Sequence, residues 1–239
     1  MSKIIALITA GGSGFRMRTD MRKQYIEIKN KPILAHTINK FHIIDEIDEI
    51  AVTVPVEDID FVKTNIIEKF NFKKVKYLIS GGEKRQDSVF QALKSIIADD
   101  NDIILIHDGV RPFISHDIIL NCIRSLDTSD GSIVGIEPVN TIKAFTTGGT
   151  ISETLDRSGL ISVQTPQTFK FGFIKKCHEL ASLEKFYATD DSALVEKFGR
   201  ELLGRKPIIS VVEGSSFNIK ITNQNDLVIA SALLEHLSV

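Results

Sequence analysis

Apolar residues follow two alternating patterns along the chain. Short runs rich in β-branched residues predict strands at residues 4–8, 50–54, 75–79, 103–106, 132–136 and 208–212. Between them, apolar residues recur at helical spacing and predict helices at residues 33–41, 59–70, 85–97, 117–126, 172–183, 192–198 and 226–237. Strands separated by helices predict an α/β fold, with a mostly parallel sheet flanked by helices and ligands at the carboxyl ends of the strands.

One segment breaks this alternation. Between about residues 139 and 160, two short strand-like stretches lie on either side of Gly148 and Gly149, which predicts a β-hairpin arm. An isolated two-stranded arm is barely stable in water, so this arm needs a surface to pack against. Its own sheet and a second subunit are both open as that surface.

Composition narrows the class of protein. The chain has 239 residues, 43% of them hydrophobic, and no linker or repeat, so we expect a single domain over residues 1–239. A net charge of -2 without a basic tract argues against nucleic acid or an anionic membrane as a partner. No stretch resembles a signal peptide or approaches ~20 apolar residues, so we expect a cytoplasmic protein. Cys122 and Cys177 are predicted to be buried, reduced thiols.

A glycine-rich loop follows the first predicted strand. It contains Ala10, Gly11, Gly12, Ser13 and Gly14, and the basic residues Arg16 and Lys23 come shortly after. Glycines let backbone N–H groups approach a phosphate closely, and cationic side chains then balance its charge. The order matches neither the common phosphate loop nor the dinucleotide fingerprint. We interpret it as a nucleotide loop that carries its own arginine, and a tight connection without a ligand is the alternative.

Two further segments lie at the ends of predicted strands. Gly82, Glu83 and Ser88 surround the start of a predicted helix, where N–H groups and small side chains can bind a base or phosphate, or simply cap the helix. Asp108 comes directly after a strongly apolar strand, a good position for a carboxylate that holds Mg²⁺ between phosphate oxygens. Its neighbour His107 is interpreted as a core histidine. Arg111 can pair with Asp108, because a buried aspartate usually needs a cation.

The remaining polar segments are less specific. Residues 156–158 and 164–169 form one such group, in which Arg157 offers bidentate hydrogen bonds to a phosphate. Taken without the rest of the chain, this group is better explained as a surface ion pair and a turn. Residues 189–192 predict a helix N-cap. Residues 217–222 are strand-like, with Lys220 on the face opposite Ile219 and Ile221, so its ammonium either points toward a ligand or is exposed.

Taken in order, these motifs resemble the 2-C-methyl-D-erythritol 4-phosphate cytidylyltransferase family of the non-mevalonate isoprenoid pathway. They run from TAGGSGFRM and KQY through KPILAHT, GGEKRQDSV, HDGVRPF, TIK, TLDRS, QTPQTF and TDDSALVE to NIKIT, and so cover nearly the whole chain. The resemblance implies a Rossmann-like sheet with a protruding β-arm and a homodimer that exchanges the arm. It also implies an Mg²⁺-dependent reaction of CTP with methylerythritol phosphate that releases pyrophosphate.

The resemblance also implies roles for single residues. Ala10 to Gly14 would wrap the phosphates and base edge of CTP, with Gly82, Glu83 and Ser88 recognising cytosine. Arg16, Lys23 and Lys220 would form the catalytic set around the α-phosphate, and Asp108 would bind Mg²⁺ or the ribose. The acceptor would be bound by Arg111, Thr141, Arg157 and Thr165, with Thr141 and Arg157 reaching from the partner subunit.

Some positions depart from the family pattern. Arg18 and Arg22 add two charges to the loop, and the shortened Val139-Asn140-Thr141 lacks an acidic residue at the acceptor end. The alternatives are therefore a ribitol 5-phosphate, or other polyol phosphate, cytidylyltransferase and a non-catalytic nucleotide-binding protein of the same fold. TIK, LDRS and TDD favour methylerythritol phosphate, and the presence of Arg16, Lys23, Asp108 and Lys220 together favours an enzyme.

Overall fold

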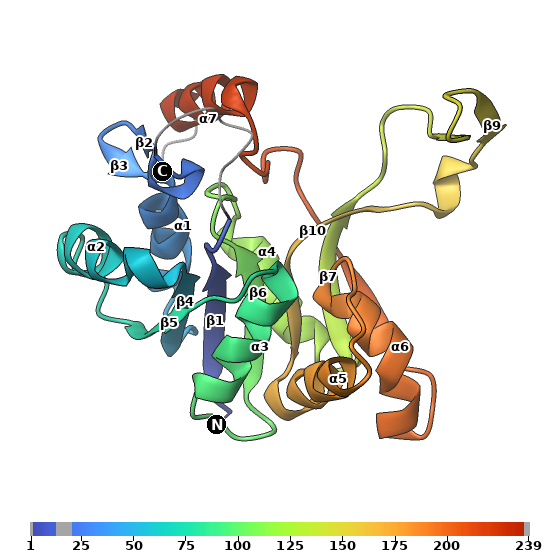
Figure 1. Ribbon diagram of the computed structural model, residues 1–239, viewed down its shortest axis with the longest axis horizontal. Helices are drawn as coiled ribbons and strands as arrows, with labels where there is room; N and C mark the ends of the chain where they lie inside the picture. Colours follow the sequence, from blue (N-terminus) through green and yellow to red (C-terminus); the bar gives the residue numbers. More distant parts are fainter. Residues whose placement is uncertain (1, 13–20, 237–239) are drawn as a thin grey trace.

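A seven-stranded sheet forms the centre of the protein in the computed structural model, which describes residues 2–12 and 21–236 (Figure 1). Its strand order is β11-β7-β10-β6-β1-β4-β5. The strands are β1 (Ile4–Thr9), β4 (Glu49–Val54), β5 (Val75–Ser80), β6 (Ile103–Asp108), β7 (Gly131–Ile136), β10 (Ser162–Lys170) and β11 (Ile209–Glu213). Neighbours are parallel except at β10, which runs antiparallel to β6 and β7. The predicted α/β fold with a mostly parallel sheet is confirmed.

Strand β10 is the one member of this sheet that the sequence analysis does not predict. Residues 164–169, for which a surface turn is favoured there, lie between β6 and β7 instead. Pro166 sits where the register with β7 shifts, the kind of place where a sheet tolerates a proline. Gln167 is fully buried, donates to Asp190 Oδ2 at 2.7 Å and accepts from the backbone N–H of Ser192 at 2.9 Å. These bonds allow a polar side chain to lie inside the sheet.

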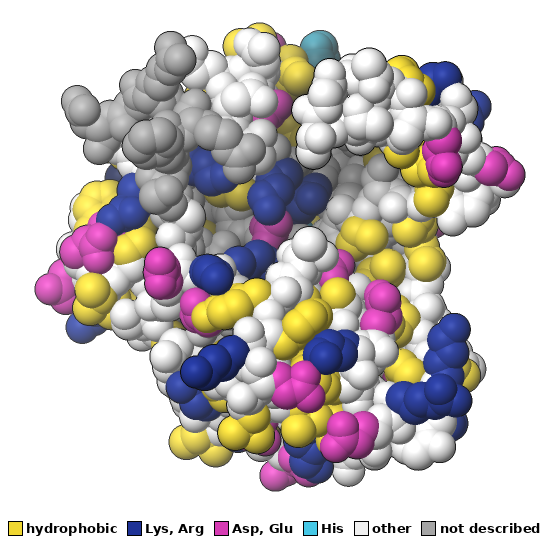
Figure 2. Space-filling view, turned by 45° about the vertical axis from the view of Figure 1, so that its right-hand side comes forward, with side chains coloured by type: hydrophobic (Ala, Val, Ile, Leu, Met, Phe, Trp, Pro, Cys, Tyr) yellow, Lys and Arg dark blue, Asp and Glu magenta, His cyan; other side chains and the backbone are white. Residues whose placement is uncertain are grey.

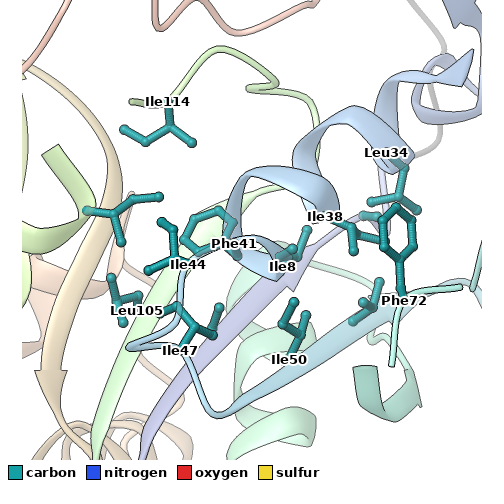
Figure 3. Packing of buried hydrophobic residues seen from close by; sticks show 14 of the residues in the cluster. Ile8, Leu34, Ile38, Phe41, Ile44, Ile47, Ile50, Phe72, Leu105 and Ile114 are labelled. Atoms are coloured by element: carbon teal, nitrogen blue, oxygen red, sulfur yellow. The ribbon is translucent and has the colours of Figure 1, made fainter. Parts of the chain in front are cut away.

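Helices cover both faces of the sheet. They are α1 (Ile33–His42), α2 (Ile59–Val62), α3 (Arg85–Ser95), α4 (His116–Ser125), α5 (Phe171–Leu183), α6 (Asp191–Leu203) and α7 (Gln224–His236). Side chains of α1, α2 and α4 pack on one face, as Figure 3 shows for α1, and those of α3, α5 and α6 pack on the other. Within β1, Ala6 and Ile8 join the first cluster while Ile5 and Leu7 join the second, the alternation expected of a strand buried on both sides.

All seven predicted helices are present, with one change of type. The helix predicted at residues 59–70 begins as α2 and continues as a π-helix, η4 (Lys63–Glu68). Two 3-10 turns, η2 (Lys23–Tyr25) and η3 (Val56–Asp58), lie after the glycine loop and after β4. A small hairpin of β2 (Glu27–Ile28) and β3 (Lys31–Pro32) follows η2 and packs under α7. The last 3-10 turn, η5 (Arg157–Gly159), closes the arm.

Residues 217–222 contain no strand, so that prediction is wrong. The backbone N–H of Ile221 donates to the Val110 carbonyl at 2.9 Å, and Arg111 Nη1 donates to the Asn218 carbonyl at 2.7 Å. Ile221 is fully buried below α7. The apolar alternation thus reflects isolated anchoring contacts rather than a hydrogen-bonded ladder, and these contacts hold Lys220 above the carboxyl end of β6.

The predicted arm is a separate hairpin. Strands β8 (Lys143–Phe145) and β9 (Ile151–Thr154) pair antiparallel and extend away from the main sheet (Figure 1). Phe145 is 76% exposed and Ile151 is 61% exposed. The arm therefore does not pack on the protein's own sheet, and packing on a second subunit stays a prediction.

Both cysteines are buried free thiols, as the sequence predicts. Burial raises the pKa of Cys122 and of Cys177 to about 12, which disfavours the reactive thiolate at neutral pH. Among residues 2–12 and 21–236, no helix has both the length and the apolar character that crossing a bilayer requires.

Candidate active site

A cavity of about 350 Å³ opens at the carboxyl ends of β1 and β6. In the space-filling view, Lys and Arg side chains gather around a hollow in the upper part of the face (Figure 2). The cavity brings together nine of the residues that the sequence analysis singles out: Ala10, Gly11, Gly12, Lys23, Gly82, Glu83, Ser88, Asp108 and Lys220. These residues come from five separate stretches of the chain, so the topology of the sheet is what assembles the site.

Gln24, which the sequence analysis does not single out, hydrogen-bonds to the backbone of the glycine loop. Its buried side-chain amide donates to the carbonyl of Ala10 at 2.7 Å and to that of Gly12 at 3.2 Å. Gln24 belongs to η2, the same turn that carries Lys23. The loop and the lysine are therefore fixed relative to one another. Ser13, Gly14 and Arg16, which were also singled out, lie outside the described residues.

The start of α3 forms the opposite wall. The N–H of Gly82 donates to Ser88 Oγ at 3.1 Å, and the N–H of Lys84 donates to Asp87 Oδ2 at 3.1 Å. A Cβ atom on Gly82 would lie 2.4 Å from the Cβ of Asp87, so this turn needs a glycine. Asp87 thus caps the start of the helix, as one reading of the sequence expected, whereas Ser88 holds the turn that precedes it. Gly82, Glu83 and Ser88 all line the cavity.

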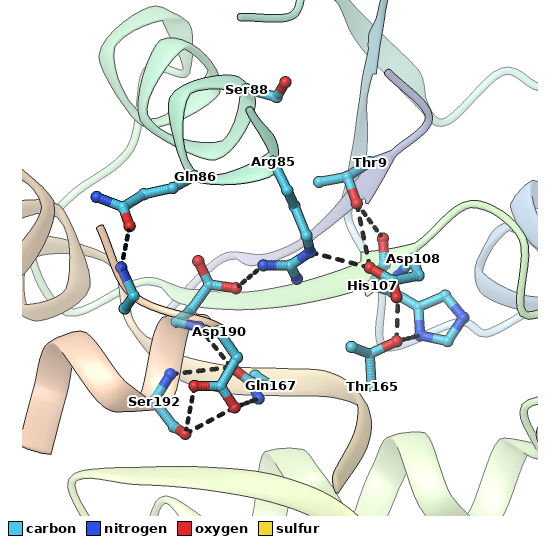
Figure 4. A network of polar contacts seen from close by, with 12 residues as sticks. Thr9, Arg85, Gln86, Ser88, His107, Asp108, Thr165, Gln167, Asp190 and Ser192 are labelled. Atoms are coloured by element: carbon cyan, nitrogen blue, oxygen red, sulfur yellow. Dashed lines mark hydrogen bonds and ion pairs between the residues drawn. The ribbon is translucent and has the colours of Figure 1, made fainter. Parts of the chain in front are cut away.

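Asp108 is the centre of the charge distribution. Its side chain is 8% exposed, and its Oδ1 lies 3.0 Å from Arg85 Nε (Figure 4). Its Oδ2 lies 2.7 Å from Lys220 Nζ. Burial alone would raise the pKa of Asp108, but Arg85 and Lys220 outweigh that effect and hold its pKa well below the usual range. Asp108 is therefore a carboxylate at any physiological pH.

Arg85, like Gln24, lines the cavity but is not singled out by the sequence analysis. It bridges two buried carboxylates, since its Nη1 also lies 2.7 Å from Asp191 Oδ2. Burial opposes the charge on Arg85, but Asp191 and Asp108 raise its pKa above the ordinary value. The sequence expectation that a buried Asp108 needs a cation is right, but Arg85 is the nearer partner: Arg111 Nε lies 3.9 Å from Asp108 Oδ2.

His107 is a core histidine, as predicted. Its Nε2 lies 3.1 Å from the Arg111 carbonyl, so this nitrogen carries the proton, and Nδ1 accepts from the Thr165 hydroxyl at 3.0 Å. The same hydroxyl accepts from the backbone N–H of Asp108 at 3.1 Å. Burial lowers the pKa of His107 to about 4, so it is neutral at pH 7. His107 and Thr165 thus hold Asp108 in place.

The four residues predicted for the acceptor do not line this cavity. Thr165 is buried against His107, and Arg111 is largely buried with its guanidinium on the Asn218 carbonyl. Thr141 and Arg157 lie on the exposed arm, where Arg157 donates to the Val139 carbonyl. Their role in acceptor binding stays a prediction.

Among the described residues, no group of three or more His, Cys, Asp and Glu side chains could hold a metal ion. Asp108 is the buried carboxylate of the cavity. Mg²⁺ is commonly held by one or two carboxylates together with substrate phosphates, so this donor set fits Mg²⁺ that arrives with a nucleotide rather than a resident metal. The site can bind a polyphosphate through backbone N–H groups, Lys23 and Lys220, and it contains no nucleophile that the described residues activate.

Comparison with known proteins identifies the family. Residues 4–236 match the family model described as IspD, 2-C-methyl-D-erythritol 4-phosphate cytidylyltransferase. The protein of that name from Geotalea uraniireducens is 40% identical over 234 residues, 98% of this chain and 97% of the relative. The one from Clostridioides difficile is 44% identical over 229 residues, 95% of this chain and 92% of the relative.

Solved structures agree with the sequence relatives. The crystal structure of 4-diphosphocytidyl-2C-methyl-D-erythritol synthase from Anaerococcus prevotii matches with a TM-score of 0.82 at 33% identity. The match covers 98% of this chain and 97% of that one. The full-length match in sequence, the shared fold and the cavity at the sheet edge lead to one conclusion: the chain belongs to the 2-C-methyl-D-erythritol 4-phosphate cytidylyltransferase family.

Proposed function

We propose that this cytidylyltransferase joins CTP and 2-C-methyl-D-erythritol 4-phosphate to give CDP-methylerythritol and pyrophosphate. The observation that carries the proposal is the cavity in which the glycine loop, Lys23, Asp108 and Lys220 meet, in a chain that matches the family over its whole length. A phosphate oxygen of the acceptor attacks the α-phosphorus of CTP, the bond to the β-phosphate breaks, and pyrophosphate leaves.

Both substrates of this reaction are anions, and two lysines reduce the electrostatic repulsion between them. Lys23 and Lys220 both line the cavity and would offset the charge on the reacting phosphorus and on the departing pyrophosphate. Lys220 is 41% exposed and now pairs with Asp108, so it can exchange this partner for a phosphate oxygen. Catalysis then depends on positioning and charge, and no side chain forms a covalent bond to the substrate.

The requirement for Mg²⁺ is part of the proposal. Asp108 would hold the ion together with phosphate oxygens of CTP, and the ion would supply further charge neutralisation at the phosphates. The ionised state of Asp108, maintained by Arg85 and Lys220, supports this role. Alternatively, Asp108 would bind the ribose of CTP.

The acceptor site is proposed to lie between two subunits of a homodimer. Thr141 and Arg157 sit on the exposed arm, and a two-stranded arm with exposed Phe145 and Ile151 needs a partner surface. A C2 dimer would let the arm of one subunit bring Arg157 to the cavity of the other. The cytoplasmic location expected from the sequence likewise stays a prediction.

A pyrophosphate assay tests the function. Purified protein with CTP, Mg²⁺ and methylerythritol phosphate should release pyrophosphate, and omission of the acceptor or addition of a chelator should abolish the signal. Lys23→Ala serves as the matched inactive control. Release without an acceptor, or release that Lys23→Ala leaves unchanged, would contradict the proposal.

A further inference from the structure

We infer that Arg22 is a positioning residue for Lys23 and acts through an ion pair with Asp58. The inference deepens the proposed function, because it rests on the catalytic role of Lys23. Arg22 directly precedes η2, so whatever fixes Arg22 also fixes the start of the turn from which Lys23 enters the cavity. We call the group of Arg22, Tyr25, Glu57 and Asp58 the Arg22 clamp.

The clamp joins η2 to η3. Arg22 Nε lies 2.8 Å from Asp58 Oδ2, and the guanidinium also pairs with Glu57. The Tyr25 hydroxyl donates to the same Asp58 oxygen at 2.8 Å. One carboxylate therefore receives bonds from the residues on both sides of Lys23 and Gln24. Asp58 is 17% exposed and Arg22 is 28% exposed, so the pair is shielded more than an ordinary surface ion pair.

Lys23 is thereby held from two directions. On the cavity side, Gln24 ties η2 to the carbonyls of the glycine loop. On the far side, the clamp ties η2 to η3, which follows strand β4 of the main sheet after one residue. The ring of Tyr25 packs against Phe61 with centroids 5.1 Å apart, which resists rotation of the turn. A catalytic group works best when its support is rigid, and this arrangement fixes the backbone of Lys23 to the sheet.

Arg22 also explains how the protein tolerates an extra charge beside the glycine loop. Its guanidinium faces two adjacent carboxylates instead of the cavity, so it neutralises η3 and does not compete with Lys23 for a phosphate. Charge-assisted hydrogen bonds from one planar guanidinium to two separate carboxylates give orientation as well as energy, which suits a positioning role.

The test is a double-mutant cycle on the enzyme. Arg22→Gln should lower kcat about tenfold and leave the KM for CTP within about threefold, because a small displacement of a catalytic group costs turnover more than binding. Asp58→Asn should lower kcat similarly. The double variant should be no worse than either single variant, since each removes the same ion pair. Arg22→Lys should recover part of the loss.

The matched control is Arg205→Gln, which removes a cation from another pair, 2.7 Å from Asp130, and should keep kcat within about twofold. Active sites are counted by CTP titration so that misfolded protein is excluded. Additive effects, or a loss confined to Arg22→Gln, would mean that Arg22 touches the substrate and would overturn the inference. If Lys23→Ala is inactive and Arg22→Gln is normal, only this inference fails. If Lys23→Ala is active, the proposed role of Lys23 fails.

Discussion

The buried His107 makes the stability of this protein depend on pH in a defined window. Burial lowers its pKa from 6.5 to about 4, so the folded chain disfavours the proton that the unfolded chain accepts. The stabilisation from neutral His107 is complete above pH 6.5 and is lost as the pH falls from 6.5 to 4. Between pH 7.5 and pH 4.5 the loss amounts to about 2.5 kcal/mol.

The contribution of His107 to the pH dependence of stability can be separated from that of other ionisable groups. Burial opposes the charge on Asp108 and Asp191, but neighbouring cations lower the pKa of both, so their contribution is lost only below pH 3.8. The substitution His107→Gln retains a donor for the Arg111 carbonyl and an acceptor for the Thr165 hydroxyl but cannot titrate. The exposed His116 provides a matched control, His116→Gln.

The assay is urea unfolding at a fixed protein concentration and at several pH values between 7.5 and 4.5. Wild type and His116→Gln should lose stability in parallel, while His107→Gln should lose about 2.5 kcal/mol less over the same range. Equal losses in all three proteins would refute the argument that His107 is held neutral by burial. A smaller loss of stability in His116→Gln than in wild type would show that His116 contributes to the pH dependence, against the argument.

Three predictions address the site. Lys23→Ala should lower kcat at least ~100-fold in a folded protein, and near-normal turnover would remove Lys23 from the catalytic set. Mixing Arg157→Ala chains with Lys23→Ala chains should restore activity above either variant, because each heterodimer keeps one intact site; verified heterodimers without recovery would contradict the shared site. Calorimetric titration should show weaker CTP·Mg²⁺ binding in Asp108→Asn than in wild type and unchanged binding in Arg157→Ala. Arg157→Ala should instead have a higher KM for the acceptor. Weaker CTP binding in Arg157→Ala and normal CTP binding in Asp108→Asn would contradict both assignments.

The strands that the sequence predicts and the strand that it misses differ in a physical way. The six predicted strands are recognised by β-branched apolar runs, and in the interior strands β1, β4, β6 and β7, which helices cover on both faces, nearly every side chain is buried. Strand β10 is equally central, but Gln164, Thr165, Gln167 and Thr168 lie in it. Of these, Gln164 bonds to residues 215 and 218, Thr165 bonds to His107, and Gln167 bonds to Asp190 and to the first N–H groups of α6. Such compensation depends on distant segments and has no local signature.

The same distinction holds within the site. The glycine loop, Gly82 and Asp108 are recognisable because each stands at the end of an apolar run, where the fold class already places ligands. Arg85 and Gln24 act through partners 23 and 14 positions away, so only the folded chain reveals them. Lys220 was singled out because residues 217–222 were predicted to form a strand, and that prediction is wrong. Its ammonium nevertheless lies in the site, because the contacts of Ile221 hold this segment next to Asp108.

Acceptor choice is the most direct test of the account's central claim. Equimolar methylerythritol phosphate and ribitol 5-phosphate are offered together with CTP and Mg²⁺, and the diphosphate products are identified by phosphorus NMR. The account predicts CDP-methylerythritol and one pyrophosphate for each CTP consumed. CDP-ribitol as the main product would assign the chain's activity to the other acceptor, and unchanged CTP at high enzyme concentration would contradict its assignment as a catalyst.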